Sequence, residues 1–160
     1  MPLILKGPRQ NRLLPKGAVC PLPVELRDVM PTLLGLAGLP VPACVEGQNL
    51  LPLLRGETAN ARPYVHGEHT IFGQSMHWVT DGREKFVWLT GSGKEQFFDL
   101  VNDPQELRDL LHTPQGEARA SRWRQALIAE LAGREEGFTA GKRLIPGRPV
   151  APCLRQVLET

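Results

Sequence analysis

Three histidines and one carboxylate lie within twelve residues of one another and form the most reactive group of side chains in this sequence. His66, Glu68 and His69 occupy the run HGEH, and His77 follows in the next apolar run. Imidazole and carboxylate groups can bind a polar substrate, exchange protons or hold a divalent metal ion. We assign these four residues to substrate binding.

Two other interpretations of this cluster stay open. In the first, the run is a polar strand end exposed at the rim of a sheet. In the second, His66, Glu68 and His77 bind a metal ion, because the ligand types fit although no fixed spacing such as HExxH is present. Alternation along a strand places His66 and Glu68 on one face and His69 on the other. Our assignment names no metal ligand.

No side chain in the sequence lies in a motif that activates a nucleophile. None of the three serines is in a G-x-S-x-G turn, and the Gly-Lys pair at Gly93-Lys94 lacks the rest of a phosphate-binding loop. The acidic residues near Asp99 are better interpreted as turn and cap residues than as calcium ligands. We therefore assign no catalytic residue, no metal and no cofactor to this chain.

The cysteines are Cys20, Cys44 and Cys153, an odd number without a CxxC pair. Their spacing suits no zinc motif, so we expect free thiols in a reducing compartment and a cytoplasmic chain. A Cys20–Cys44 bridge is the alternative if a parent protein is secreted.

Composition excludes several classes of partner. The 160 residues correspond to about one domain, and the net charge of +2 is too small to indicate nucleic acid or an anionic membrane. No apolar run approaches the roughly 20 residues of a membrane span. The opening MPLILKGPRQ is too short in its apolar part for a signal peptide.

Alternating apolar residues predict a sheet that positions the histidines. Asp81-Gly82 and residues 91–93 are turn signals, so neighbouring strands should be antiparallel. The expected strands are Pro63–Gly67, Met76–Thr80, Lys85–Leu89 and Glu95–Leu100.

Helices are expected both before and after the four strands in the sequence. A short apolar helix over Asp28–Leu39 begins at Asp28 and ends at Gly38, and a second over Gly47–Gly56 is capped by Asn49. After the sheet, Asp103 should cap a helix through Gln105–Leu111. A polar helix over Pro114–Arg134 carries an apolar stripe of Trp123, Ala126, Leu127, Glu130 and Leu131.

These elements predict an α+β fold, with a four-stranded antiparallel sheet packed against the C-terminal helix and with short N-terminal helices and irregular loops. We divide the chain into residues 1–61, residues 62–134 and an extended tail over residues 135–160. The apolar run Pro2–Leu5 is expected to be a strand, although nothing before it can pair with it.

Four runs of the sequence resemble the C-terminal region of the sulfatase (arylsulfatase) family, within the alkaline-phosphatase-like superfamily. They are DVMPTLLGLAG, HGEH, HWVTDGREKFVW and EQFFDLVNDPQELRDL. The resemblance covers roughly residues 2–111. It departs from the family at Gly35, where an acidic residue is usual, and at Arg108-Asp109-Leu110, where Asn-Leu is commoner.

The resemblance implies a C-terminal fragment or truncated homologue of a sulfatase, which contributes one wall of the cleft for a sulfate-ester substrate. The family's formylglycine, made from C/S-x-P-x-R, and its calcium ligands precede this region, and neither motif is found here. The chain alone should then be inactive. Two alternatives stay open: a non-catalytic module that self-associates through Pro2–Leu5 and Asp28–Leu39, and a fragment of a phosphatase or phosphonate monoester hydrolase.

Overall fold

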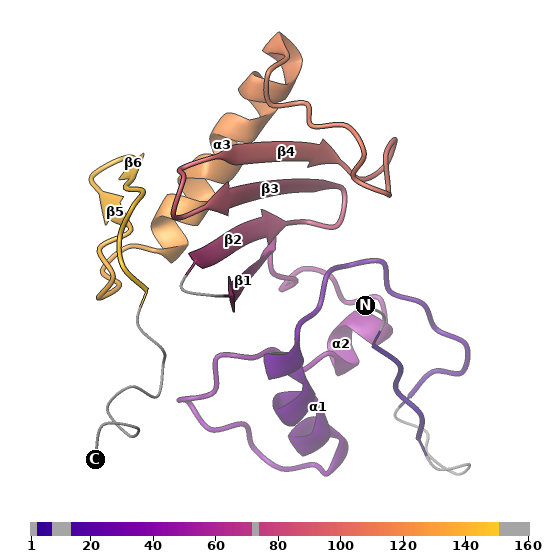
Figure 1. The fold of residues 1–160 in the computed structure, drawn as a ribbon. Helices are drawn as coiled ribbons and strands as arrows, with labels where there is room; N and C mark the ends of the chain where they lie inside the picture. The colour runs from indigo at the N-terminus through magenta and orange to yellow at the C-terminus, as the bar shows by residue number, and fades with distance from the viewer. Residues whose placement is uncertain (1–2, 8–13, 72–73, 151–160) are drawn as a thin grey trace. The chain divides into compact units, whose positions relative to one another are not determined.

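The computed structural model describes residues 3–7, 14–71 and 74–150. The chain divides into two compact units, Met1–Val65 and His66–Thr160, and each is considered by itself (Figure 1). Our three-part division of the sequence stays a prediction. Within the described ranges, no helix is both long and apolar enough to cross a membrane.

The second unit is built on the predicted four-stranded sheet. Its strands are β1 (Val65–Ile71), β2 (Gln74–Thr80), β3 (Glu84–Leu89) and β4 (Glu95–Asp99), and they lie in the order β1-β2-β3-β4. Both β2–β3 and β3–β4 are antiparallel, as the turn signals predicted. The fold class predicted from the sequence is confirmed.

The strand register places five buried side chains of the sheet opposite or next to one another. Val79 pairs with Phe86, which pairs with Phe97, and His77 pairs with Trp88. All five of these side chains are buried. This row of residues forms the face of the sheet on which the long helix packs.

The helix α3 (Pro114–Glu130) covers this face (Figure 1). The side chain of Thr113 caps it by accepting a hydrogen bond from the Gly116 backbone N–H at 3.0 Å. The predicted apolar stripe was partly wrong, because Ala126 is only half-buried and Glu130 is exposed. The buried positions follow three-four spacing, which keeps them on one side of the helix: Gly116, Ala120, Trp123, Leu127 and Leu131.

The predicted helix over Gln105–Leu111 is wrong. Glu106 has a positive φ of 57°, which interrupts a right-handed helix. The following residues instead extend along β4, where the Phe97 N–H donates to Asp109 Oδ1 at 3.1 Å and the Leu110 N–H donates to the Phe97 carbonyl at 2.8 Å. Pairing with an edge strand therefore takes precedence over the local helix signal of Asp103 and Pro104.

The segment after α3 is more structured than the extended tail we predicted. Short strands β5 (Thr139–Ala140) and β6 (Arg143–Leu144) form a hairpin, and Phe138 is only 1% exposed. Its ring packs edge-on against His77 and Trp88, with centroids 5.2 and 5.6 Å away. Burial of this aromatic side chain draws the segment onto the sheet. The last ten residues of the predicted tail lie outside the described residues.

In the first unit, the expected helices are present but their caps differ. The helix α1 (Val29–Leu36) follows a 3-10 turn, η1 (Leu26–Asp28). Gly38, just past the end of α1, has the predicted left-handed conformation with φ of 69°. In the helix α2 (Leu51–Leu54), the N-cap position is occupied by Leu50 rather than Asn49, without a side-chain capping hydrogen bond. Asn49 nevertheless accepts a hydrogen bond from the Leu51 N–H, so its side chain still satisfies a free donor of that helix.

Asp28 does not cap α1, which corrects our prediction. Its carboxylate accepts hydrogen bonds from the backbone N–H of Glu25 and of Gln48, at 2.9 and 2.8 Å, and pairs with Arg62 at 2.5 Å. Burial raises the pKa of Asp28, while the Gln48 hydrogen bond partly opposes this. The backbone of Leu50 likewise donates to the hydroxyl of Thr32. Asp28 and Thr32 thus join the segments that carry α1 and α2.

The predicted strand at Pro2–Leu5 is not formed over its described part. Residues 3–7 have no regular structure, and Pro2 lies outside the described residues. A strand needs a neighbour to satisfy its backbone groups, and no described strand pairs with this run. The side chain of Ile4 is accordingly 83% exposed. Cys20 and Cys44 are both free thiols, so the alternative of a bridge between them is excluded in this structure.

Candidate functional site

Strand β1 presents its side chains alternately to the two faces of the sheet. Gly67 lies against Trp78, so closely that a Cβ on Gly67 would meet the indole ring at 2.2 Å. Its neighbours His66 and Glu68 therefore point to the opposite face, toward His77 of β2. The predicted common face of His66 and Glu68 is confirmed by their contacts with His77.

The side chains of His66, Glu68 and His77 meet at this edge of the sheet. His66 Nε2 lies 3.2 Å from His77 Nδ1, and Glu68 Oε2 lies 3.6 Å from the same nitrogen. The three ligand atoms are all within 4.8 Å of one another. The other ring nitrogen of His77, Nε2, lies 3.1 Å from the hydroxyl oxygen of Ser75.

The environment of His77 favours a neutral ring. The side chain is fully buried, and it packs against Phe138 and Trp88. Burial, followed by the nearby His66 ring, lowers the pKa of His77 to about 4. At neutral pH, one ring nitrogen of His77 therefore carries a lone pair and the other a proton.

Sequence reasoning missed two residues of this site, Arg134 and Glu136. Arg134 Nη1 lies 2.5 Å from Glu68 Oε2, and Arg134 Nη2 lies 2.7 Å from Glu136 Oε1. The hydrogen bonds to Glu136 and to Glu68 raise the pKa of Arg134. The only signal was the charged run after Gly133, which gives no information on what those charges contact.

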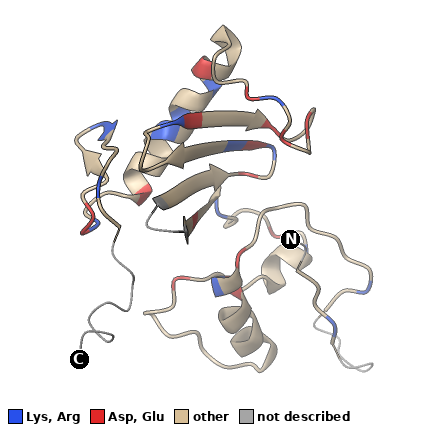
Figure 2. Ribbon diagram, viewed as in Figure 1, with Lys and Arg blue, Asp and Glu red and all other residues tan. Residues whose placement is uncertain are grey.

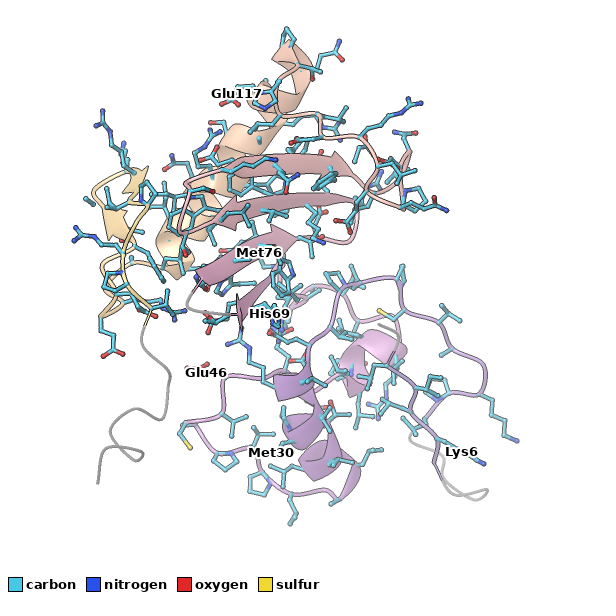
Figure 3. All side chains as sticks on the ribbon, in the orientation of Figure 1. Lys6, Met30, Glu46, His69, Met76 and Glu117 are labelled. Atoms are coloured by element: carbon cyan, nitrogen blue, oxygen red, sulfur yellow. The ribbon has the colours of Figure 1, made fainter. Side chains whose placement is uncertain are left out.

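The remaining predicted residue, His69, is not part of the cluster. It follows Glu68 on β1, so it points to the opposite face, and it is exposed (Figure 3). The structure therefore brings together three of the four predicted side chains. Glu68 is 43% exposed, so Glu68 and His69 offer polar groups to solvent on the two faces of one strand.

The Ser75–His77 contact pairs a hydroxyl nucleophile with an imidazole base, but a substrate cannot reach either side chain. Ser75 is 5% exposed and His77 is 0% exposed, so no ester could reach the serine hydroxyl. Because a nucleophile must approach the reacting atom, we interpret this pair as orienting the His77 ring. Of the four predicted residues, Glu68 and His69 are exposed.

A second polar cluster lies between α3 and the ends of β3 and β4. Glu84 accepts hydrogen bonds from Trp123, Arg122 and Arg119, and Arg119 also pairs with Asp99 at 2.8 Å. Burial opposes ionisation of Glu84, but these donors outweigh it and hold its pKa below the usual range.

The space beside this cluster is a polar cavity of about 170 Å³. Its lining residues carry charges that balance. Figure 2 shows basic (blue) segments of α3 and, at the other end of β4 from this cavity, the acidic (red) start of that strand. The lining residues are Asp81, Arg83, Glu84, Asp99, Val101, Asn102, Arg119 and Arg122. Since most of these charges are paired across elements, the cluster fixes α3 to the sheet and is a poor candidate for binding an ion.

Residues 1–132 match the family model described as N-sulphoglucosamine sulphohydrolase, C-terminal. This chain belongs to the sulfatase family. It is 43% identical over 136 residues to an arylsulfatase of Clostridium perfringens and 38% identical over 93 residues to a Delta 4,5-hexuronate-2-O-sulfatase of Bacteroides thetaiotaomicron. The matches span 85% and 54% of this sulfatase chain, but only 28% and 19% of those relatives.

Solved structures show the same fold. A 2-O GAG sulfatase superposes with a TM-score of 0.62 at 26% identity, covering 81% of this chain and 31% of the other. A phosphonate monoester hydrolase of Agrobacterium radiobacter superposes with a TM-score of 0.52 at 22% identity, covering 78% and 28%. The second likeness concerns the fold alone. The site residues of β1 and β2 lie within the range matched by the family model, whereas Arg134 and Glu136 lie beyond it.

Proposed function

We propose that this chain forms one wall of the substrate cleft of a sulfatase, and that a sulfate ester is hydrolysed by groups outside residues 1–160. The observation that carries this proposal is the polar strand β1 at the edge of the sheet. It exposes Glu68 and His69 on a rigid element, where positioned polar groups can distinguish substrates.

The charges of the wall indicate which part of a substrate it contacts. A sulfate group is anionic, so the Glu68 carboxylate would repel it and is better suited to accept hydrogen bonds from hydroxyl groups elsewhere on the ester. Arg134 holds Glu68 by a charge-assisted hydrogen bond, which fixes the direction of the acceptor. His69 is exposed on the other face of β1, so it can donate to or accept from a substrate only where that substrate reaches around the edge strand.

The test uses a chimera in which this chain replaces the matching C-terminal region of the Clostridium perfringens arylsulfatase. We expect the chimera to hydrolyse an aryl sulfate. We expect Glu68→Gln and His69→Ala each to lower kcat/KM about tenfold, because losing a hydrogen bond to the substrate costs roughly 1–2 kcal/mol. The control is Gln125→Ala, which changes an exposed residue of α3. Unchanged kcat/KM in both site variants would refute the proposal that Glu68 and His69 form part of the wall of the substrate cleft.

Two further measurements separate the parts of this proposal. The 160-residue chain by itself should not turn over an aryl sulfate, because the serine that lies beside a histidine base, Ser75 next to His77, is buried. Turnover by the purified chain would contradict the assignment of chemistry to other residues. The expected cytoplasmic location belongs to this proposal and is checked by cell fractionation.

A second proposal, self-association of the chain, has its own observation. On and after α1, Met30, Leu33 and Leu39 are 49%, 56% and 55% exposed, which leaves large apolar side chains on this segment in contact with solvent. We propose that α1 contacts a second copy of the chain, with the Pro2–Leu5 run beside it. Sedimentation should show a dimer that Leu33→Glu dissociates and Val101→Glu, at an exposed position of the second unit, does not. A monomer at micromolar concentration would refute it.

A further inference from the structure

We propose that His66, Glu68 and His77 bind a divalent transition-metal ion, with Zn²⁺ as the best fit. The three residues supply two imidazole nitrogens and one carboxylate oxygen from neighbouring strands. This ligand set is the one that zinc sites with an open fourth position use. The proposal concerns metal binding alone and does not depend on the sulfatase cleft.

The separations of the ligand atoms suit one metal ion. With metal–ligand bonds of about 2.0–2.1 Å, ligands of a tetrahedral zinc site lie about 3.3 Å apart. The two distances from His77 Nδ1, 3.2 Å to His66 Nε2 and 3.6 Å to Glu68 Oε2, bracket this value. The third pair of ligand atoms, from His66 and Glu68, lies within 4.8 Å, so we expect the exposed Glu68 side chain to rotate toward the two imidazoles on binding.

Groups around the three ligands are arranged as they are around metal sites. The hydroxyl of Ser75 lies at Nε2 of His77, which can hold that nitrogen protonated and leave the lone pair on Nδ1. Arg134 donates to the Glu68 carboxylate, and ligating carboxylates are commonly hydrogen-bonded in this way. Glu136 also pairs with Arg134. The two carboxylates, of Glu68 and Glu136, together with the one guanidinium therefore carry a net charge of −1, which favours a cation.

The proposed ligands differ in how exposed and how firmly held they are. His77 is fully buried and fixed by Phe138, while Glu68 is exposed on the solvent side. A metal ion can therefore enter from the side of Glu68 and find the innermost ligand already oriented. The cost of ordering ligands on binding is correspondingly small.

The experiment is calorimetric titration of the full, tag-free chain with ZnCl₂, after treatment with chelator. The cysteines are replaced by serine (Cys20→Ser, Cys44→Ser and Cys153→Ser), because thiolates bind zinc independently. We expect one equivalent of Zn²⁺ to bind. We also expect His66→Ala to weaken binding at least about tenfold, since losing even a residue that only supports a ligand costs about 10- to 100-fold.

The neighbouring histidine gives a matched control. His69→Ala removes an imidazole three positions further along the same strand but on the other face, so it should leave Zn²⁺ affinity unchanged. Glu68→Gln keeps the shape of an exposed side chain and should weaken binding without affecting the fold. In addition, Co²⁺ in the site should give the intense visible absorption of tetrahedral coordination. Absence of binding, or equal affinity in His66→Ala and His69→Ala, would overturn the proposal.

Discussion

Phe138 is the side chain whose removal tests most directly that the segment after α3 is part of the core. We predict that Phe138→Ala destabilises the second unit by about 3–5 kcal/mol, the usual cost of removing a buried phenylalanine. The magnitude follows from its 1% exposure and from the edge-on contacts with His77 and Trp88, at centroid distances of 5.2 and 5.6 Å. Because these two rings are themselves buried, the cavity has little means to collapse.

The assay is urea unfolding followed by tryptophan fluorescence, for which Trp88 is a probe in direct contact with the substituted ring. With an m-value of about 2 kcal/mol per molar urea, the midpoint should fall by roughly 2 M. Phe138→Leu, which keeps most of the volume, should cost less than about 1.5 kcal/mol. Val101→Ala, at a position 58% exposed, should change stability by no more than about 0.5 kcal/mol. If Phe138→Ala falls within that range too, the segment does not pack as described.

Two further substitutions test the packing of the sheet and its charged contacts. Gly67→Ala should destabilise the second unit by about 1–3 kcal/mol, because the added Cβ would overlap the Trp78 ring. Adding Trp78→Leu to the Gly67→Ala chain should recover part of this loss. Urea unfolding measures the stability of both variants. Hydrogen bonds from Arg119 and from the Asn102 backbone lower the pKa of Asp99 to about 2, below its ordinary 3.8, so the native state binds this proton less readily than the unfolded state. The stability that this carboxylate contributes is thus present above about pH 4 and is lost as the pH falls toward 2. Asp99→Asn should flatten this part of the curve of urea midpoint against pH, and an unchanged curve would show that Arg119 does not stabilise the ionised form.

The sheet was predictable because its signals are local. Alternation along β2 and β3 and the turn residues between them determine which side chains share a face, and Gly82 has the expected positive φ of 85°. The helix predicted after β4 failed for the opposite reason. Asp103 and Pro104 are a sound local signal, but the hydrogen bonds of Phe97 with Asp109 and Leu110 depend on a partner twelve or more residues away.

The site was predictable to the same extent. Two-residue alternation puts His66 with Glu68 and separates His69 from both, and this much needs only a strand. The approach of His77 depends on how β2 lies beside β1. Arg134 is 66 residues from Glu68 in sequence, and no pattern in its own neighbourhood distinguishes a guanidinium that holds a carboxylate from one that is solvated.

The alternation of β1 also limits how this region can change during evolution. Substitutions at His66 or His69 alter one face at a time, but a single inserted or deleted residue before Gly67 exchanges the two faces for the rest of the strand. A slip of one residue would press the side chain of His66 or Glu68 against Trp78, where only a glycine fits, and would turn the remaining polar groups away from His77. Among relatives of this chain, changes of length should therefore collect outside this strand, while HGEH and the tryptophan that faces it keep a constant separation.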